Sequence, residues 1–126
     1  MRLLLDTHVF LWWVKGDKRL PKISIDKIKE AEEVYMSSAS IWEIAIKMRL
    51  GKISGHMNAL IQEIHKSHFL ELPVTSQHAA ATLGLPDIHR DPFDRILIAQ
   101  AVSEPLVFLT ADPKLKKYSE LVEVIL

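Results

Sequence analysis

Short apolar runs alternate with amphipathic segments along most of this chain. Residues 2–5 form a run that is too brief for a helix, and runs of the same kind recur four more times. Short, continuous apolar runs are typical of strands that are buried on both faces of a sheet. They predict strands over residues 2–5, 34–37, 69–72, 106–109 and 122–126.

Segments with apolar residues at helical spacing separate these strands. In Ser40–Leu50, for example, Ile41, Ile44, Ala45 and Met48 lie on one face, and Gly51 ends the segment. Another helix begins at Pro92, because proline is favoured at the first helical position. The predicted helices span Thr7–Val14, Ser24–Glu33, Ser40–Leu50, His56–Lys66, Gln77–Leu83, Pro92 through Val102, and the short Lys114–Tyr118.

Strands that alternate with helices predict an α/β fold with a parallel sheet covered on both faces. We expect residues 1–126 to form one domain of three α/β/α layers around a short parallel sheet. In such sheets, ligands bind beyond the carboxyl ends of the strands. Asp6 and Asp112 follow predicted strands and are therefore expected at that edge.

Four acidic residues lie at or near the boundaries of apolar segments: Asp6, Glu43, Asp94 and Asp112. If the fold brings them together, their charges repel, so protons or cations must occupy the site. Oxygen ligands select Mg²⁺ or Mn²⁺, and the chain has no cysteine to favour a softer metal. We expect all four to be catalytic, with Asp6 and Asp94 as the first metal ligands.

Each acid also has a structural interpretation. Asp6 can cap the helix that follows it, and Glu43 can pair with Lys47 one helical turn later. Asp112 precedes Pro113 and can cap the next short helix. Asp91 differs from Asp94 in this respect, because it directly precedes Pro92 and is better explained as a cap alone.

Composition limits the partners and the compartment. The chain has 16 Lys and Arg and 16 Asp and Glu, so it lacks the basic excess that gives tight nonspecific binding to nucleic acid. The absence of cysteine excludes disulfides and thiolate zinc sites. Asp6 interrupts the apolar start, and no uncharged stretch is long enough for a membrane span. These features predict a cytoplasmic protein that does not enter a membrane.

Four stretches carry a resemblance to a known family: LLLDTHVFLWW (3–13), SSASIWEIAIKMRLGK (37–52), HRDPFDRILIAQA (89–101) and FLTAD (108–112). In this order and spacing they resemble the PIN domain, and within it the VapC-like toxins of type II toxin–antitoxin pairs. The resemblance implies a magnesium-dependent endoribonuclease, with Mn²⁺ as an alternative metal. It places Asp6, Glu43, Asp94 and Asp112 in the active site, with Thr110 beside them.

The resemblance also implies partners, namely an RNA substrate, a small cognate antitoxin that shields the site, and a second copy in a homodimer. Two other functions stay open: a metal-dependent phosphoryl-transfer enzyme, and a non-catalytic protein-binding module whose acids are only caps. His8 after Asp6 argues against a haloacid-dehalogenase-like enzyme, which has a second aspartate there. The sequence leaves open whether His8, Thr110, Arg90 or Arg95 contacts substrate.

The adjacent Trp12 and Trp13 cannot both face one core from the same helix. We therefore expect one of them either to lie in an interface or to cover a neighbouring loop. His65 and His68 have a spacing that could bind zinc, but no third ligand is evident.

Overall fold

The computed structural model describes residues 1–125, and within them five parallel strands form one sheet in the order β3-β2-β1-β4-β5. This is the predicted α/β fold. The strands are β1 (Arg2–Leu5), β2 (Glu33–Ser37), β3 (Leu70–Leu72), β4 (Val107–Thr110) and β5 (Val122–Val124). The predicted last strand extended to Leu126, which lies outside the described residues.

The helices alternate with these strands as predicted. The bounds are α1 (Thr7–Lys15), α2 (Lys22–Glu30), α3 (Ser38–Arg49), α4 (Met57–Lys66), α5 (Ser76–Ala81) and α6 (Pro92–Ser103). Two 3₁₀ helices complete the set, η1 (Thr82–Gly84) and η2 (Pro113–Tyr118). No helix of the described chain has the length and apolar character needed to cross a membrane.

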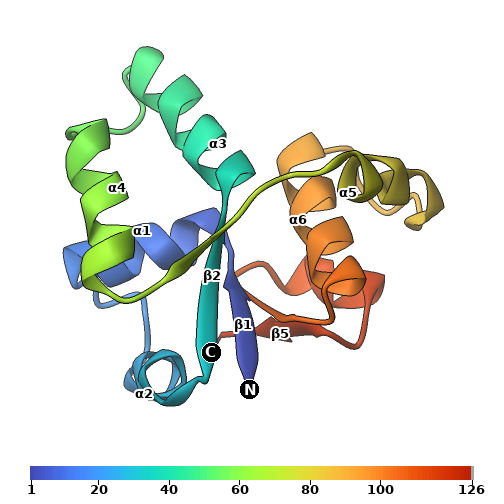
Figure 1. The fold of residues 1–126 in the computed structure, drawn as a ribbon, viewed down its shortest axis with the longest axis horizontal. Helices are drawn as coiled ribbons and strands as arrows, with labels where there is room; N and C mark the ends of the chain where they lie inside the picture. The colour runs from blue at the N-terminus through green and yellow to red at the C-terminus, as the bar shows by residue number, and fades with distance from the viewer. Residues whose placement is uncertain (126) are drawn as a thin grey trace.

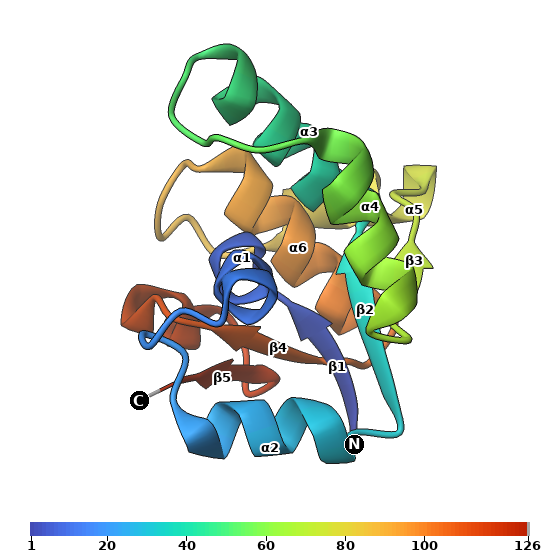
Figure 2. The ribbon, with the colours of Figure 1, turned by 90° about the vertical axis from the view of Figure 1, so that its left-hand side faces the viewer.

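Two hydrophobic clusters cover the two faces of the sheet. Leu3 and Leu5 of β1 pack in a cluster with residues of α1, α2 and α4, whereas Leu4 packs on the opposite face with residues of α6 and η2. This alternation follows from the two-residue period of side chains along a strand. Figures 1 and 2 show the resulting layers, with α3 rising above the upper end of β2 and β1.

The sheet order creates a switch point beside β1. The chain passes from β1 to β2 on one side, and it returns to β4 on the other. Leu5 is paired with Leu109, and the backbone N–H of Asp6 donates to Leu109 O at 2.9 Å. Asp6 therefore lies where crevices form in parallel α/β sheets.

Some predicted boundaries were wrong. The second helix begins at Lys22 and ends at Glu30, not at Ser24 and Glu33, because Pro21 occupies its N-cap and Ala31 is already extended. Lys114–Tyr118 lies in a 3₁₀ helix that starts at Pro113. The segment predicted as one helix over Gln77–Leu83 changes from α to 3₁₀ geometry after Ala81.

The paired tryptophans are both partly buried against the core of their own chain. Trp13 donates through its indole N–H to Ser67 Oγ at 2.9 Å. The guanidinium of Arg19 lies 4.9 Å from the ring centroid of Trp12, so Trp12 is covered by the loop that follows α1. Since each ring has partners within the chain, this pair gives no support to the predicted homodimer.

Candidate active site

Asp6 lies at the start of α1, immediately beyond β1. It caps the helix, and its Oδ1 accepts the backbone N–H of Thr7 at 2.7 Å. Its Oδ2 accepts the hydroxyl of Thr110, at the end of β4, at 2.6 Å. The side chain is only 6% exposed. The structural interpretation of Asp6 as a cap is thus correct, but capping does not explain the second contact, which joins two adjacent strands.

Glu43 reaches the same region from the second turn of α3. It is 9% exposed, which is unusual for a glutamate. Its Oε1 accepts the hydroxyl of Thr7 at 2.8 Å, and its Oε2 lies 3.0 Å from Lys47 Nζ. The same Thr7 hydroxyl lies 2.9 Å from Ser40 Oγ. The predicted pair with Lys47 therefore exists, but it holds a buried carboxylate and not a solvated one.

Asp91 has the capping role expected of it, whereas Asp94 makes a different contact. Asp91 is the N-cap of α6, and its Oδ1 accepts the backbone N–H groups of Phe93 and Asp94. Asp94 lies in the first turn of α6, and its Oδ2 lies 3.1 Å from His89 Nε2. Its other oxygen, Oδ1, receives no hydrogen bond from the described chain, so it is free to bind a ligand.

The pKa shifts show that these carboxylates share one electrostatic environment. Burial raises the pKa of Asp94 to about 7, and the negative charges of Asp6 and Asp91 add to the shift. Burial also raises the pKa of Asp6, with a further contribution from the charge of Glu43. Desolvation and like charges both favour the neutral acid, so a cation at this place would relieve both costs.

Asp112 is connected to Asp6 through one hydroxyl. The backbone N–H of Asp112 donates to Thr110 Oγ1 at 3.1 Å, and that hydroxyl donates to Asp6. The carboxylate of Asp112 accepts the backbone N–H of Lys114 and caps η2. The fourth acid therefore belongs to the same edge of the sheet, with its side chain engaged in the predicted cap.

The donor chemistry of this edge fits a hard divalent cation. Among residues 1–125, no three His, Asp or Glu side chains form a set that could hold a metal ion by themselves. Asp6 and Asp94 nevertheless supply oxygen donors whose charges repel one another. Magnesium is commonly bound through one or two carboxylates, with water and substrate phosphate completing its shell. This pair therefore suits Mg²⁺ or Mn²⁺, and it lacks the nitrogen and sulfur ligands that zinc prefers.

Two residues that contact this site, His89 and Tyr118, were not predicted from the sequence. His89 lies between Asp94 and Tyr118, with Nδ1 2.8 Å from the Tyr118 hydroxyl. His89 and Asp94 lie on either side of Pro92, which begins α6, and this spacing could have suggested their contact. No local feature of the sequence places Tyr118 beside His89. Arg95 donates through its guanidinium to the carbonyls of Pro86 and Thr82, and also to the hydroxyl of Tyr118.

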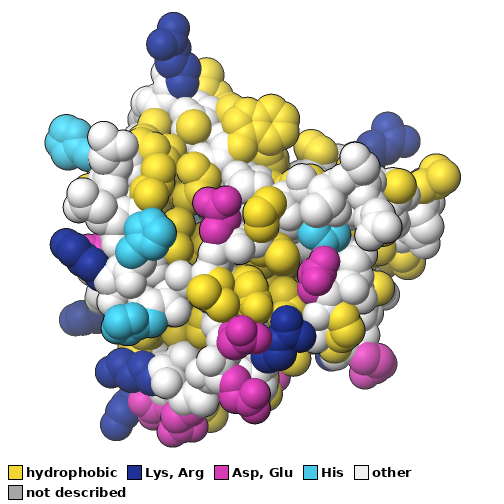
Figure 3. Space-filling model, viewed as in Figure 1, with side chains coloured by type: hydrophobic (Ala, Val, Ile, Leu, Met, Phe, Trp, Pro, Cys, Tyr) yellow, Lys and Arg dark blue, Asp and Glu magenta, His cyan; other side chains and the backbone are white. Residues whose placement is uncertain are grey.

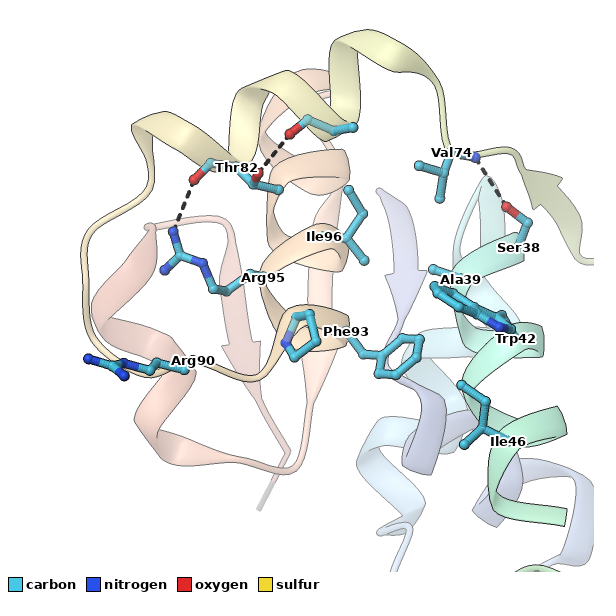
Figure 4. Close-up of a pocket in the computed structure, with 12 residues that line it drawn as sticks. Ser38, Ala39, Trp42, Ile46, Val74, Thr82, Arg90, Phe93, Arg95 and Ile96 are labelled. Carbon is cyan, nitrogen blue, oxygen red and sulfur yellow. Dashed lines mark hydrogen bonds between the residues drawn. The ribbon is translucent and has the colours of Figure 1, made fainter. Parts of the chain in front are cut away.

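A groove of about 800 Å³ lies between α3 and the helices α5 and α6, and its lining includes Trp42 and Phe93, the chain neighbours of Glu43 and Asp94. Trp42 and Phe93 point toward one another across it (Figure 4), with ring centroids 5.3 Å apart. Trp42 is 64% exposed, and Ile46 and Leu50 continue an exposed apolar stripe along α3. Apolar side chains are also visible over this helix on the face shown in Figure 3. Among the described residues that line the groove, only Arg90 and Arg95 carry a positive charge.

Comparisons with known proteins agree with this architecture. The family model of the PIN domain matches residues 3–121. The chain is 28% identical over 119 residues to Ribonuclease VapC22 of Mycobacterium tuberculosis, covering 92% of this chain and 91% of the relative.

Two solved structures have the same fold. The first is VapBC2 from Rickettsia felis bound to a DNA fragment from its promoter, with a TM-score of 0.71 and 14% identity, covering 97% of this chain and 96% of that chain. The second is FitAB bound to the IR36 DNA fragment, with a TM-score of 0.63 and 19% identity, covering 87% and 85% of the two chains.

Proposed function

Because this chain belongs to the PIN domain family, we propose that it is a metal-dependent endoribonuclease and the toxin of a type II toxin–antitoxin pair. The observation that carries the proposal is that buried Asp6 and partly buried Asp94, which come from different elements, are near enough for the charge of Asp6 to raise the pKa of Asp94. The name of the relative from Mycobacterium tuberculosis supports ribonuclease activity.

Asp6 and Asp94 would hold Mg²⁺, with Mn²⁺ as a substitute. When bound, such an ion lowers the pKa of a coordinated water and neutralises charge on the scissile phosphate. Asp6 is fixed by Thr7 and Thr110, so its carboxylate is positioned before any ligand arrives. Preorganised groups of this kind lower the barrier because they need little rearrangement during the reaction.

Glu43 and Asp112 would act beside the metal ligands. Glu43 is held between Thr7 and Lys47, where it can orient the attacking water or accept a proton from it. Asp112 stands at the start of η2, close to Thr110, where it can bind a metal-bound water. In this scheme Thr7 and Thr110 are positioning residues, and all four acids remain catalytic.

The proposed chemistry is tested by incubating the protein with defined RNAs in magnesium and in chelator. We expect cleavage at internal phosphodiester bonds with magnesium and none with chelator, and activity should return when the metal is restored. The Asp6→Asn protein keeps one oxygen that can accept the Thr7 N–H, and its NH2 group can donate to the Thr110 hydroxyl, but it loses the charge, so it should fold and fail to cleave. Metal-independent cleavage would contradict the proposal, as would full activity of the Asp6→Asn protein.

The proposal of an antitoxin partner is supported by solved structures with the same fold, which are of VapBC2 and FitAB. We propose that the antitoxin is a small protein whose tail combines apolar residues with an arginine. The apolar residues would bind the groove of Trp42 and Phe93, and the arginine would pair with Asp6 and Asp94. Arginine suits this role because its guanidinium binds carboxylates in a bidentate manner.

Co-expression with the product of the neighbouring gene tests the toxin assignment separately from the nuclease assignment. We expect a stable complex that does not cleave RNA, and a Trp42→Ala protein that escapes inhibition while it retains cleavage. Trp12→Ala is the matched control, because Trp12 lies outside the groove. A complex that cuts RNA at the free enzyme's rate would exclude the toxin function and leave the nuclease function intact. The molecular mass in solution tests the predicted homodimer independently.

A further inference from the structure

His89 is placed between the active-site edge and η2. Its Nε2 lies 3.1 Å from Asp94 Oδ2, and its Nδ1 lies 2.8 Å from the hydroxyl of Tyr118. The two rings are 5.5 Å apart between centroids. Both ring nitrogens of His89 are therefore engaged, so the ring orientation is fixed from both ends.

The hydrogen bonds around Tyr118 determine which nitrogen of His89 carries the hydrogen. The Tyr118 oxygen accepts the backbone N–H of His89 at 3.1 Å and an N–H of the Arg95 guanidinium at 3.3 Å. A hydroxyl oxygen has two lone pairs, and these two donors occupy both. An additional N–H from His89 Nδ1 would have no lone pair to meet, so Nδ1 must be an acceptor.

The single hydrogen of the Tyr118 hydroxyl has two acceptors within reach. The carbonyl oxygen of His89 lies at 3.2 Å, whereas Nδ1 lies at 2.8 Å. Donation to the nearer Nδ1 leaves the hydrogen of the neutral imidazole on Nε2. In that tautomer, Nε2–H donates to Asp94 Oδ2.

We propose that Tyr118 and His89 form a positioning relay for Asp94, in which the Tyr118 hydroxyl fixes the Nε2–H tautomer of His89 and the imidazole holds one oxygen of the Asp94 carboxylate. The effect of the relay on metal binding rests on the proposed function, in which Asp94 is a metal ligand. With Oδ2 held by His89, the remaining Oδ1 would be the oxygen left to bind a cation. Groups that donate to ligating carboxylates commonly change metal affinity by about 10- to 100-fold when they are removed.

The relay also connects two parts of the active site through one short element. Asp112 caps the beginning of η2, and Tyr118 is its last residue. Tyr118 is buried in the hydrophobic cluster on the α6 face of the sheet, so its hydroxyl has a fixed position. The placement of η2 therefore determines the position of Asp112 and, through His89, the orientation of Asp94.

The tautomer can be measured directly in the metal-free protein, independently of any nuclease activity. Long-range ¹H–¹⁵N NMR spectra at pH 8 distinguish the two neutral tautomers, and the His89 signals are identified by their absence in a His89→Gln protein. We expect the Nε2–H form in the parent protein and a mixture of both forms in Tyr118→Phe. An Nδ1–H form in the parent, or an unchanged spectrum in Tyr118→Phe, would overturn the relay.

Measuring the affinity for Mn²⁺ tests the predicted effect of the relay on metal binding by Asp94. Titration with Mn²⁺, followed by electron paramagnetic resonance, should show about 10-fold weaker binding in Tyr118→Phe and up to about 100-fold weaker binding in His89→Phe. His89→Gln should recover part of the loss, because its amide N–H can replace Nε2–H. Tyr35→Phe and His65→Phe are the matched controls, since both residues lie away from the site, in β2 and on the exposed side of α4.

Three outcomes separate the relay from the proposed function. Weaker Mn²⁺ binding in Tyr118→Phe and His89→Phe, with partial recovery in His89→Gln, supports the relay. Equal Mn²⁺ binding by Tyr118→Phe, His89→Phe and the parent overturns it, even if all of them cleave RNA. If the parent binds Mn²⁺ but cleaves no RNA, the nuclease function fails, whereas the affinity differences between variants still decide the relay.

Discussion

Asp91 and Asp94 are separated by one turn of the same helix, but their environments differ. Asp91 is exposed and accepts two backbone N–H groups, whereas Asp94 is partly buried and repelled by Asp6. A cap stabilises a helix by its hydrogen-bonding oxygen, which asparagine also provides. A metal ligand with a raised pKa contributes through its charge, which asparagine lacks.

Replacing these two residues by asparagine should therefore have opposite effects. Asp94→Asn should lower RNA cleavage by at least about 100-fold, since it removes a ligand and not merely a supporting contact. Its melting temperature without metal should be no lower than that of the parent, because repulsion from Asp6 is relieved. Asp91→Asn is the control and should keep most of the activity. An active Asp94→Asn protein would mean that the wrong aspartate has been assigned to the metal.

The raised pKa of Asp94 also predicts how stability depends on pH. In the folded, metal-free protein Asp94 titrates at about 7, compared with about 4 in the unfolded chain. Between these values the folded state binds more protons, so the contribution of Asp94 to the free energy of unfolding is present below pH 4 and is lost as the pH rises through 7. Asp6 acts in the same direction.

This dependence is measured by denaturant unfolding at several pH values in chelator. The difference in stability between Asp94→Asn and the parent should grow in favour of Asp94→Asn from about pH 4 to pH 8. Comparing the two proteins at each pH cancels the titration of other groups. A difference that does not vary with pH would show that Asp94 has no raised pKa.

At the scale of elements, the site is assembled from the ends of strands and the first turns of helices. β1 ends at Leu5, directly before Asp6, and β4 ends at Thr110, while Asp94 lies in the first turn of α6. First helical turns tolerate anions because their backbone N–H groups and the helix dipole favour negative charge. The same positions therefore suit both capping and the proposed catalysis, which is why the two interpretations could not be separated residue by residue.

Asp112, at the start of η2, allows the two roles to be separated experimentally. Asp112→Asn keeps the acceptor for the Lys114 N–H and removes the charge, whereas Asp112→Ala removes both. We expect Asp112→Asn to melt like the parent but to cleave RNA more slowly, and Asp112→Ala to lose in addition about 1 kcal/mol of stability. Thermal unfolding and cleavage assays check this. If Asp112→Asn cleaves at the parent's rate, Asp112 is a structural cap alone.

At the scale of the whole molecule, formal charge and local charge differ. The chain as a whole is neutral, yet it concentrates carboxylates at one edge of its sheet. A neutral protein has little long-range attraction for a polyanion, so we expect the proposed RNA substrate to be recognised by shape and by exposed single-stranded bases. We therefore expect cleavage at few sites in a structured RNA, which sequencing of the products would show. Broad degradation of all single strands would contradict this expectation.

Metal binding should stabilise the entire fold, because the acids come from elements on both sides of the switch point. A ligand that binds only the native state at 100 times its Kd adds about 2.7 kcal/mol to the free energy of unfolding. For a chain of this size we expect the melting temperature to rise by roughly 5–15 °C. Calorimetry with Mg²⁺ and with Mn²⁺ measures the shift, and Asp94→Asn should show almost none. No shift in the parent at millimolar metal would count against the site.

Local patterns were sufficient to predict most of the fold. The five short apolar runs became strands, and the helices between them formed where their apolar spacing placed them. The main errors were at helix ends, such as Lys22 in α2, where the exact boundary depends on a proline cap and on tertiary packing. The position of Asp91 as a cap was predictable because Pro92 follows it directly.

The sequence by itself determined the α/β class, the parallel sheet and the acidic candidates, because apolar periodicity and residue type are local properties of the chain. Only the tertiary structure decided which acids meet. The strand order put β4 beside β1, and this brought Thr110 to Asp6 over more than 100 residues of intervening chain. It also placed Tyr118 against His89, a contact that depends on how η2 packs and that no spacing in the sequence encodes.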